Sequence, residues 1–187
     1  MPVVSGSSGR GVASSLAPLM GMQYIELESR RFPDGEGYVR VPTEAIDAVR
    51  SEPVVLVSNT YPDSGIVSTL LLLEAIADVR RGDLSNLKGE EPQSMDDVGG
   101  GVFLAIPYYG YSRQDKRFSK GEAVSARVIA EILARGCDGI AILDLHEPAV
   151  LEGMDVPIEF VSSMPEIAEL LQSEVSPDFV LSPDKGA

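Results

Sequence analysis

Short β-rich runs alternate with helical stretches along this chain. The runs predict strands at residues 2–5, 22–27, 53–57, 102–106, 139–145, 156–161 and 178–181. Helical stretches follow at residues 12–20, 64–80, 122–134 and 165–173, and apolar positions of the third fall on one helix face. Ser64 is placed to cap the second helix, and Gly136 follows the third where a C-terminal glycine belongs.

This alternation predicts an α/β fold in which a mostly parallel sheet is flanked by helices. Ligands of such sheets bind beyond the carboxyl ends of the strands. That rule selects the segments after Ser5, Val57, Ile106 and Leu145. Residues 30–41 contain proline and glycines that predict a turn or hairpin outside the main pattern.

Residues 81–101 differ from their surroundings because they are rich in glycine and acidic side chains and have no hydrophobic period. They are interpreted as a mobile surface insertion, with a functional acidic loop as the alternative.

Composition restricts the classes of partner. The 187 residues carry 15 Lys and Arg against 29 Asp and Glu, a net charge of −14. Such a charge argues against nonspecific nucleic-acid binding but leaves room for small anions held by local groups. A single cysteine, Cys137, excludes a disulfide framework, and no apolar run is long enough to span a membrane. With no signal-peptide pattern at the start, we expect a cytoplasmic protein.

Glycines and serines at residues 5–11 follow the first predicted strand and precede a helix. Backbone N–H groups of such a turn suit a phosphate, and Glu26 lies where a dinucleotide fold places its ribose-binding acid. The spacing departs from G-x-G-x-x-G, however, and no Tyr-x-x-x-Lys pair is present. A nicotinamide-linked enzyme is therefore disfavoured, and tight-turn glycines without a ligand remain the alternative.

Two further segments combine aromatic and charged groups. Residues 31–36 place Phe32 beside Asp34 and Glu36, a set that could stack a base and accept hydrogen bonds from an amino group. Residues 107–118 gather cations in an otherwise acidic chain at a predicted strand end, where arginine forks suit phosphate oxygens. Solvated surface loops are the alternative in both cases.

Candidate metal ligands follow the later strands. His146, the only histidine, stands at a predicted strand end with Asp144 and Glu147 nearby, so a metal or phosphate role competes with a structural one. Asp184 in the last segment could join a cation site.

Taken together and in order, these segments resemble the ribose-phosphate pyrophosphokinase family over essentially the whole chain. The motif sequences look most like those of its archaeal members. The motifs are VVSGSSG, RFPDGE, IPYYGYSRQDKRF with GEAVSA, ILDLH and LSPDKGA. The resemblance implies a phosphoribosyltransferase-like N-terminal domain at residues 1–161 and the start of a truncated second domain at residues 162–187. The family's loop with catalytic Lys and Arg and its ribose 5-phosphate loop have no counterpart in this sequence.

The family transfers the diphosphoryl group of MgATP to ribose 5-phosphate, giving phosphoribosyl pyrophosphate and AMP. The resemblance therefore implies ATP, ribose 5-phosphate and Mg²⁺ as ligands, and a homo-oligomer in which the hairpin reaches a neighbouring subunit's site. It implies ATP-binding roles for Phe32, Asp34, Glu36, Arg113 and Gln114. It implies metal-binding roles for His146 and Asp184. A noncatalytic nucleotide-binding or regulatory subunit that associates with full-length homologues is the alternative.

Overall fold

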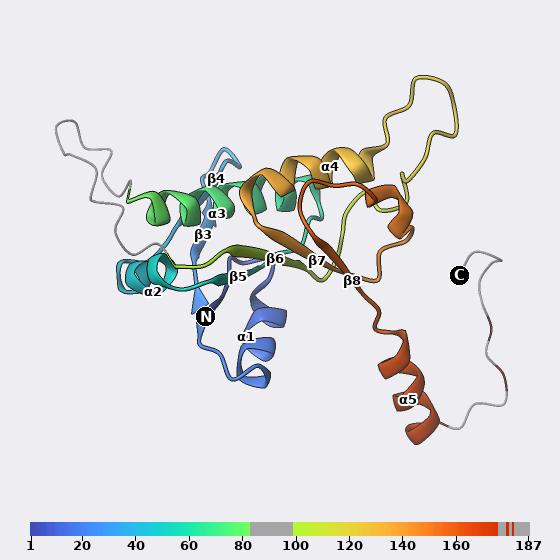
Figure 1. The fold of residues 1–187 in the computed structure, drawn as a ribbon, viewed down its shortest axis with the longest axis horizontal. Coiled ribbons are helices and arrows are strands. Elements are labelled where there is room, and N and C mark those ends of the chain that lie inside the picture. The colour runs from blue at the N-terminus through green and yellow to red at the C-terminus, as the bar shows by residue number, and fades with distance from the viewer. Residues whose placement is uncertain (83–98, 176–178, 180, 182–187) are drawn as a thin grey trace.

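The computed structural model describes residues 1–82, 99–175, 179 and 181. Within these residues a six-stranded sheet carries helices on both faces, and a two-stranded hairpin lies beside it (Figure 1). The strands are β1 (Val3–Ser5), β2 (Tyr24–Glu26), β3 (Glu28–Arg31), β4 (Gly37–Arg40), β5 (Val54–Val57), β6 (Val102–Ile106), β7 (Gly139–Leu143) and β8 (Ile158–Val161). The α-helices are α1 (Arg10–Leu19), α2 (Ile46–Ser51), α3 (Asp63–Arg81), α4 (Ser125–Leu133) and α5 (Met164–Glu174). Short 3₁₀ turns are η1 (Thr43–Ala45), η2 (Ala134–Gly136) and η3 (Pro148–Leu151).

The predicted parallel sheet is confirmed. Its strand order is β2-β1-β5-β6-β7-β8, and every neighbouring pair runs parallel. From β1 the chain first adds β2 on one side of it, at the edge of the sheet. It then returns to the other side of β1 and adds β5, β6, β7 and β8 in sequence. Because crossovers between parallel strands are right-handed, this reversal places α1 on one face and α3 with α4 on the other. The reversal makes the β1–β5 boundary a topological switch point, where ligands of such sheets bind.

The two faces of the sheet are packed unequally. The larger core joins α2, α3 and α4 to the sheet through fully buried aliphatic side chains such as Leu72, Leu104 and Leu133. On the other face, Ala13 and Ala17 of α1 lie one helical turn apart and pack against the first strands. Beyond α1 this face stays open: a hollow of about 400 Å³ lined almost wholly by apolar side chains runs over the later strands, and Phe103 is 42% exposed.

Several predicted element boundaries needed correction. Ser64 does not cap α3, because the helix already begins at Asp63. The helix predicted at residues 122–134 begins at Ser125, since Glu122 closes the preceding loop by accepting the N–H groups of Phe118 and Ser119. Gly136 is not a helix C-cap but ends η2, where a Cβ would lie 3.1 Å from that of Leu73.

The hairpin predicted at residues 30–41 is confirmed as the antiparallel pair β3 and β4. The six-residue helix α2 was not predicted, because so short a segment shows no clear period. Most of the predicted insertion at residues 81–101 lies outside the described residues, and the last predicted strand, at residues 178–181, is described only at residues 179 and 181. None of the described helices has the length and apolar character needed to cross a membrane.

Arg80 joins three elements at the amino end of the sheet. Its side chain, on α3, is only 7% exposed. Nη1 donates to the carbonyl oxygens of Val49 (3.0 Å) and Glu52 (2.8 Å) at the end of α2, and Nη2 donates to those of Gly99 and Gly100 before β6. One guanidinium therefore satisfies four backbone acceptors that regular structure leaves open.

We expect Arg80→Ala to lower the free energy of unfolding by about 2–3 kcal/mol, because it removes charged hydrogen bonds and leaves buried carbonyl groups without donors. Urea denaturation followed by circular dichroism measures this loss. The adjacent Arg81 is the matched control: it is exposed and pairs with Glu74 and Asp78, so Arg81→Ala should cost less than about 1 kcal/mol. Equal losses in the two variants would contradict the role given to Arg80.

Candidate functional site

Buried hydroxyl groups hold the loops after β1 and β5 together at the carboxyl edge of the sheet. Ser58, directly after β5, is fully buried, and its Oγ lies 2.7 Å from Oγ1 of Thr69 on α3 and 3.1 Å from Oγ of Ser8. Nδ2 of Asn59 donates to the carbonyl oxygen of Ser8 at 2.8 Å. The switch point is therefore closed by polar contacts that satisfy one another within the protein.

The loop after β6 is attached to the same edge. The backbone N–H of Tyr108 donates to Oδ1 of Asn59 at 3.0 Å, and that of Gly110 donates to Oγ1 of Thr60 at 2.7 Å. Thr60 is fully buried, and its own N–H donates to the carbonyl of Tyr108 at 3.1 Å. Three loops from three neighbouring strands thus form one rigid rim.

Close packing accounts for Gly9 in the glycine-rich turn. A Cβ on Gly9 would lie 2.0 Å from the carbonyl oxygen of Val57, so only glycine fits there. Nearby, Oγ of Ser7 lies 3.4 Å from Oγ of Ser29, while Arg10 forms an ion pair with Glu26. Close packing therefore accounts for Gly9 itself, and the acid considered for a ribose already has a cationic partner.

We expect Gly9→Ala to lower the free energy of unfolding by roughly 2–3 kcal/mol, because the loop after β1 must move away from β5 to admit a methyl group. Gly11→Ala is the control: a Cβ there meets nothing within 4 Å, and alanine favours the helix by up to about 1 kcal/mol. Thermal and urea unfolding of both variants measure the difference. A Gly9→Ala protein as stable as the parent would refute the packing explanation.

The hairpin tip has a defined backbone. Gly35 N–H donates to the carbonyl of Phe32, and Phe32 N–H donates to that of Glu36, both at 2.9 Å. Gly35 has a φ of +94°, which glycine adopts without strain. Oδ1 of Asp34 accepts the N–H of Glu36 at 3.0 Å, so one of the predicted carboxylates already supports the turn. The Glu36 carboxylate is exposed and makes no hydrogen bond within the described residues.

Phe32 is packed on one side only. Its ring meets that of Tyr38 edge to face at 5.9 Å, and the guanidinium of Arg30 lies 4.9 Å from its centroid. The residue remains 40% exposed. The hairpin therefore presents a partly supported aromatic surface that can accept a further flat group.

Arg113 stands in a tight turn on the loop after β6. The N–H of Gln114 donates to the carbonyl of Tyr111 at 3.0 Å, which closes the turn around Ser112 and Arg113. The Arg113 side chain is exposed and has neither a hydrogen bond nor an ion pair in the described part of the chain. Nε2 of Gln114 instead donates to the carbonyl of Lys116 at 3.2 Å. The Arg113 guanidinium is thus available to an external anion.

A cavity of about 370 Å³ adjoins this turn and brings the two predicted ATP-binding residues of the loop together. It is lined by Tyr61, Asp63, Tyr108, Tyr111, Ser112, Arg113 and Gln114. Sequence reasoning named Arg113 and Gln114 but missed Tyr61 and Asp63, which follow β5. The carboxyl-edge rule pointed to that segment, yet no pattern singled out its side chains. The cavity therefore has an aromatic wall, one free cation and one carboxylate.

His146 is exposed on the loop after β7 and makes no hydrogen bond within the described residues. The two acids predicted near it are engaged elsewhere. Asp144 accepts Ser163 Oγ–H and the Ser163 N–H (2.9 Å), contacts that hold the pKa of its carboxyl below the usual value. Oε1 of Glu147 accepts the N–H of Ala149 at 3.3 Å.

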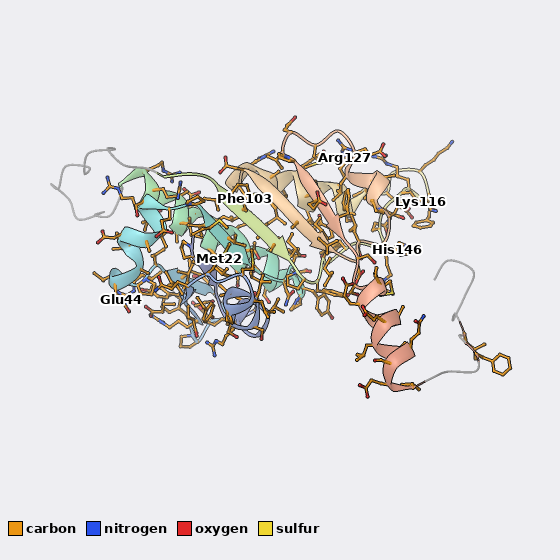
Figure 2. The ribbon with its side chains drawn as sticks, turned by 60° about the horizontal axis from the view of Figure 1, so that its bottom comes forward. Met22, Glu44, Phe103, Lys116, Arg127 and His146 are labelled. Atoms are coloured by element: carbon orange, nitrogen blue, oxygen red, sulfur yellow. The ribbon has the colours of Figure 1, made fainter. Side chains whose placement is uncertain are left out.

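The remaining predicted ligand, Asp184, lies outside the described residues. Among residues that are described, no group of three or more His, Cys, Asp or Glu side chains could hold a metal ion by itself. Figure 2 shows His146 and Lys116 at one end of the molecule and Glu44 at the other. His146 therefore shares the end of the Arg113 loop rather than the end that carries α2.

The hairpin and the Arg113 loop meet at the start of α3. Arg31 donates from Nη1 to the carbonyl of Gly35 at 2.7 Å and from Nη2 to that of Ser64 at 3.4 Å. The neighbouring Asp63 accepts a hydrogen bond from the Tyr111 hydroxyl at 2.7 Å. The structure thus links the two predicted halves of the site through α3, while no direct hydrogen bond or ring contact joins Phe32 to Arg113 among the described residues.

Comparisons with known proteins bear on the family resemblance and on the fold. Residues 100–136 match the family model described as the N-terminal domain of ribose phosphate pyrophosphokinase. The ribose-phosphate pyrophosphokinase of Methanothermobacter thermautotrophicus is 38% identical over 99% of this chain and 58% of its own length. That of Sulfurisphaera tokodaii is 30% identical over the whole chain and 58% of its own length. The predicted resemblance to archaeal members is confirmed, and the chain spans 58% of the length of these relatives.

A solved structure supports the fold. The phosphoribosylpyrophosphate synthetase from Mycobacterium smegmatis aligns with 92% of this chain and 51% of its own chain, with a TM-score of 0.71 and 19% sequence identity. At this identity the match establishes the shared architecture. It confirms the predicted parallel sheet flanked by helices, of the kind found in that enzyme's structure.

Proposed function

We propose that the protein acts as a ribose-phosphate diphosphokinase, which makes phosphoribosyl pyrophosphate and AMP from ATP and ribose 5-phosphate in nucleotide biosynthesis. The proposal rests on one combination: similarity to enzymes of this name across the chain, and a carboxyl-edge cavity in which Arg113 is free to bind an anion. In the proposed reaction the anomeric hydroxyl of ribose 5-phosphate attacks the β-phosphorus of ATP. The bond to the α-phosphate breaks, AMP leaves, and the hydroxyl proton is released.

ATP is divided between two surfaces in this proposal. Arg113 contacts phosphate oxygens because its guanidinium is unpaired and presents a fork that matches them. Gln114 contacts ATP beside it. Phe32 stacks on the adenine ring. Glu36, whose carboxylate is free, accepts a hydrogen bond from the adenine amino group more readily than Asp34, because Asp34 already accepts a hydrogen bond from the turn N–H of Glu36.

The described residues suit a magnesium ion carried by the nucleotide rather than a protein cage. Mg²⁺ prefers oxygen ligands and commonly keeps water and substrate phosphates around it. His146 has a free imidazole and is the single described side chain proposed to contact the ion, with Asp184 assigned to a second cation. The ion would neutralise phosphate charge in the transition state. The chain's contribution is to hold ATP in line with its acceptor, which is the main requirement of phosphoryl transfer.

A homo-oligomer and a cytoplasmic location complete the proposal. The exposed tip carrying Phe32 is suited to reach a neighbouring subunit's cavity, and the open apolar face around Phe103 is a surface that association would cover. Static light scattering of the purified chain tests self-association. A monodisperse monomer at all concentrations would remove the cross-subunit placement of Phe32.

Isothermal titration with MgATP, followed by an assay for AMP in the presence of ribose 5-phosphate, tests the proposed function. Binding with AMP release supports the diphosphokinase. Binding without AMP favours the alternative, a noncatalytic nucleotide-binding subunit that associates with full-length homologues. Absence of MgATP binding refutes both, and binding of NAD(P) in its place would restore the nicotinamide interpretation.

We expect His146→Ala to weaken MgATP binding about tenfold, because one ligand to the ion is lost. The exposed side chain has no hydrogen-bond partner in the described structure, so the melting temperature should stay unchanged. ATP titrated in EDTA is the internal control and should bind parent and variant equally. Identical MgATP affinities would remove His146 from the site.

A further inference from the structure

We propose that Asp63 and Tyr111 form a latch that positions Arg113 in the nucleotide site, an inference that rests on the proposed function. Tyr111 Oη donates to Oδ1 of Asp63 at 2.7 Å, and this bond raises the pKa of the Tyr111 hydroxyl. Asp63 begins α3, while Tyr111 begins the turn that carries Arg113. The latch therefore connects a long, well-packed helix to an exposed loop.

The backbone of Tyr111 shows that this position is imposed. Its φ is +64°, a left-handed conformation that bulky residues rarely adopt and that surrounding contacts must stabilise. The residue is 44% exposed, so packing covers it only in part. The bond to Asp63 and the turn bond from Gln114 are the contacts that can hold it.

The latch is a third attachment of this turn, whose other hydrogen bonds to neighbouring segments lie at its two ends in the described part of the chain. Before the turn, Gly110 N–H is bound by Oγ1 of Thr60, and after it the carbonyl of Gln114 accepts the N–H of Ala126 at 3.3 Å. The two central residues, Ser112 and Arg113, lie between these points. With the latch closed, the turn cannot rotate about its two ends, so the origin of the Arg113 side chain is fixed.

A positioning role of Asp63 can be distinguished from a purely electrostatic effect of its charge. A carboxylate lining a phosphate-binding cavity repels the ligand, so removing it should improve binding if charge were its only effect. A positioning role predicts the opposite for Asp63→Ala, because the Tyr111 hydroxyl then loses its acceptor. Asp63→Asn keeps an acceptor oxygen without the charge and should restore binding.

The decisive experiment is a double-mutant cycle on the full 187-residue chain with MgATP affinity as the readout. We expect Arg113→Ala to weaken binding about 10- to 100-fold and Tyr111→Phe about 3- to 10-fold. In the double variant the Tyr111 change should add less than about twofold, since there is no Arg113 left to position. Effects that multiply would overturn the proposal. So would Asp63→Ala binding as well as or better than the parent.

Tyr24→Phe is the matched control. It also removes one tyrosine hydroxyl bond, to Ser5 at 3.0 Å, but outside the cavity, and should leave MgATP affinity unchanged. The rate at which phenylglyoxal modifies Arg113 in the ligand-free protein gives a second readout, measured by peptide mass spectrometry. Tyr111→Phe should change this rate and Tyr24→Phe should not.

This second readout separates the two proposals. If the parent chain fails to bind MgATP while Tyr111→Phe still changes Arg113 reactivity, the proposed function fails and the latch geometry stands. If the parent binds MgATP but Tyr111→Phe alters neither affinity nor reactivity, the latch fails and the proposed function stands.

Discussion

The buried hydrogen bonds of Ser58 and Thr60 directly after β5 are the contacts on which the rest of the candidate site depends. β5 is central in the sheet, between β1 and β6, so side chains leaving its carboxyl end can reach the loops of both neighbours. Ser58 bonds toward Ser8 and α3, and Thr60 bonds toward Gly110. Because these hydroxyl groups are fully buried, breaking the bonds would leave unsatisfied polar atoms, which keeps the rim closed.

Further contacts connect this rim to the parts of the chain that are proposed to bind ATP. α3 starts beside it and holds both the hairpin, through Arg31, and the Arg113 turn, through Asp63. Three of the proposed site residues, Arg113, Glu36 and His146, have no hydrogen-bond or ion-pair partner among the described residues, and all three lie on loops. Rigid contacts thus surround unpaired functional groups, which is the arrangement that lets a site bind without first breaking its own bonds.

The opposite end of the sheet has a different organisation. There the buried guanidinium of Arg80 donates hydrogen bonds to four carbonyl groups, two at the end of α2 and two in the segment before β6. These contacts hold α3, the end of α2 and the segment before β6 together. The paired cation Arg80 therefore marks an end of the sheet that is held by internal contacts, whereas the unpaired Arg113 marks the end proposed to bind the nucleotide.

The sequence by itself determined the parallel sheet, most of its strands and the loops that carry the candidate site. These features depend on continuous apolar runs and on strand–helix alternation, which are local patterns. The ordered motifs around Phe32, Arg113 and His146 were equally visible. Only the tertiary structure decided which side chains are free to bind a ligand. In the sequence, Asp34 and Glu36 were equal candidates, as were Asp144 and His146. In the structure, Asp34 and Asp144 accept hydrogen bonds from backbone N–H groups. Asp63 and Tyr111 are 48 residues apart and meet only because parallel strands end at the same edge of the sheet.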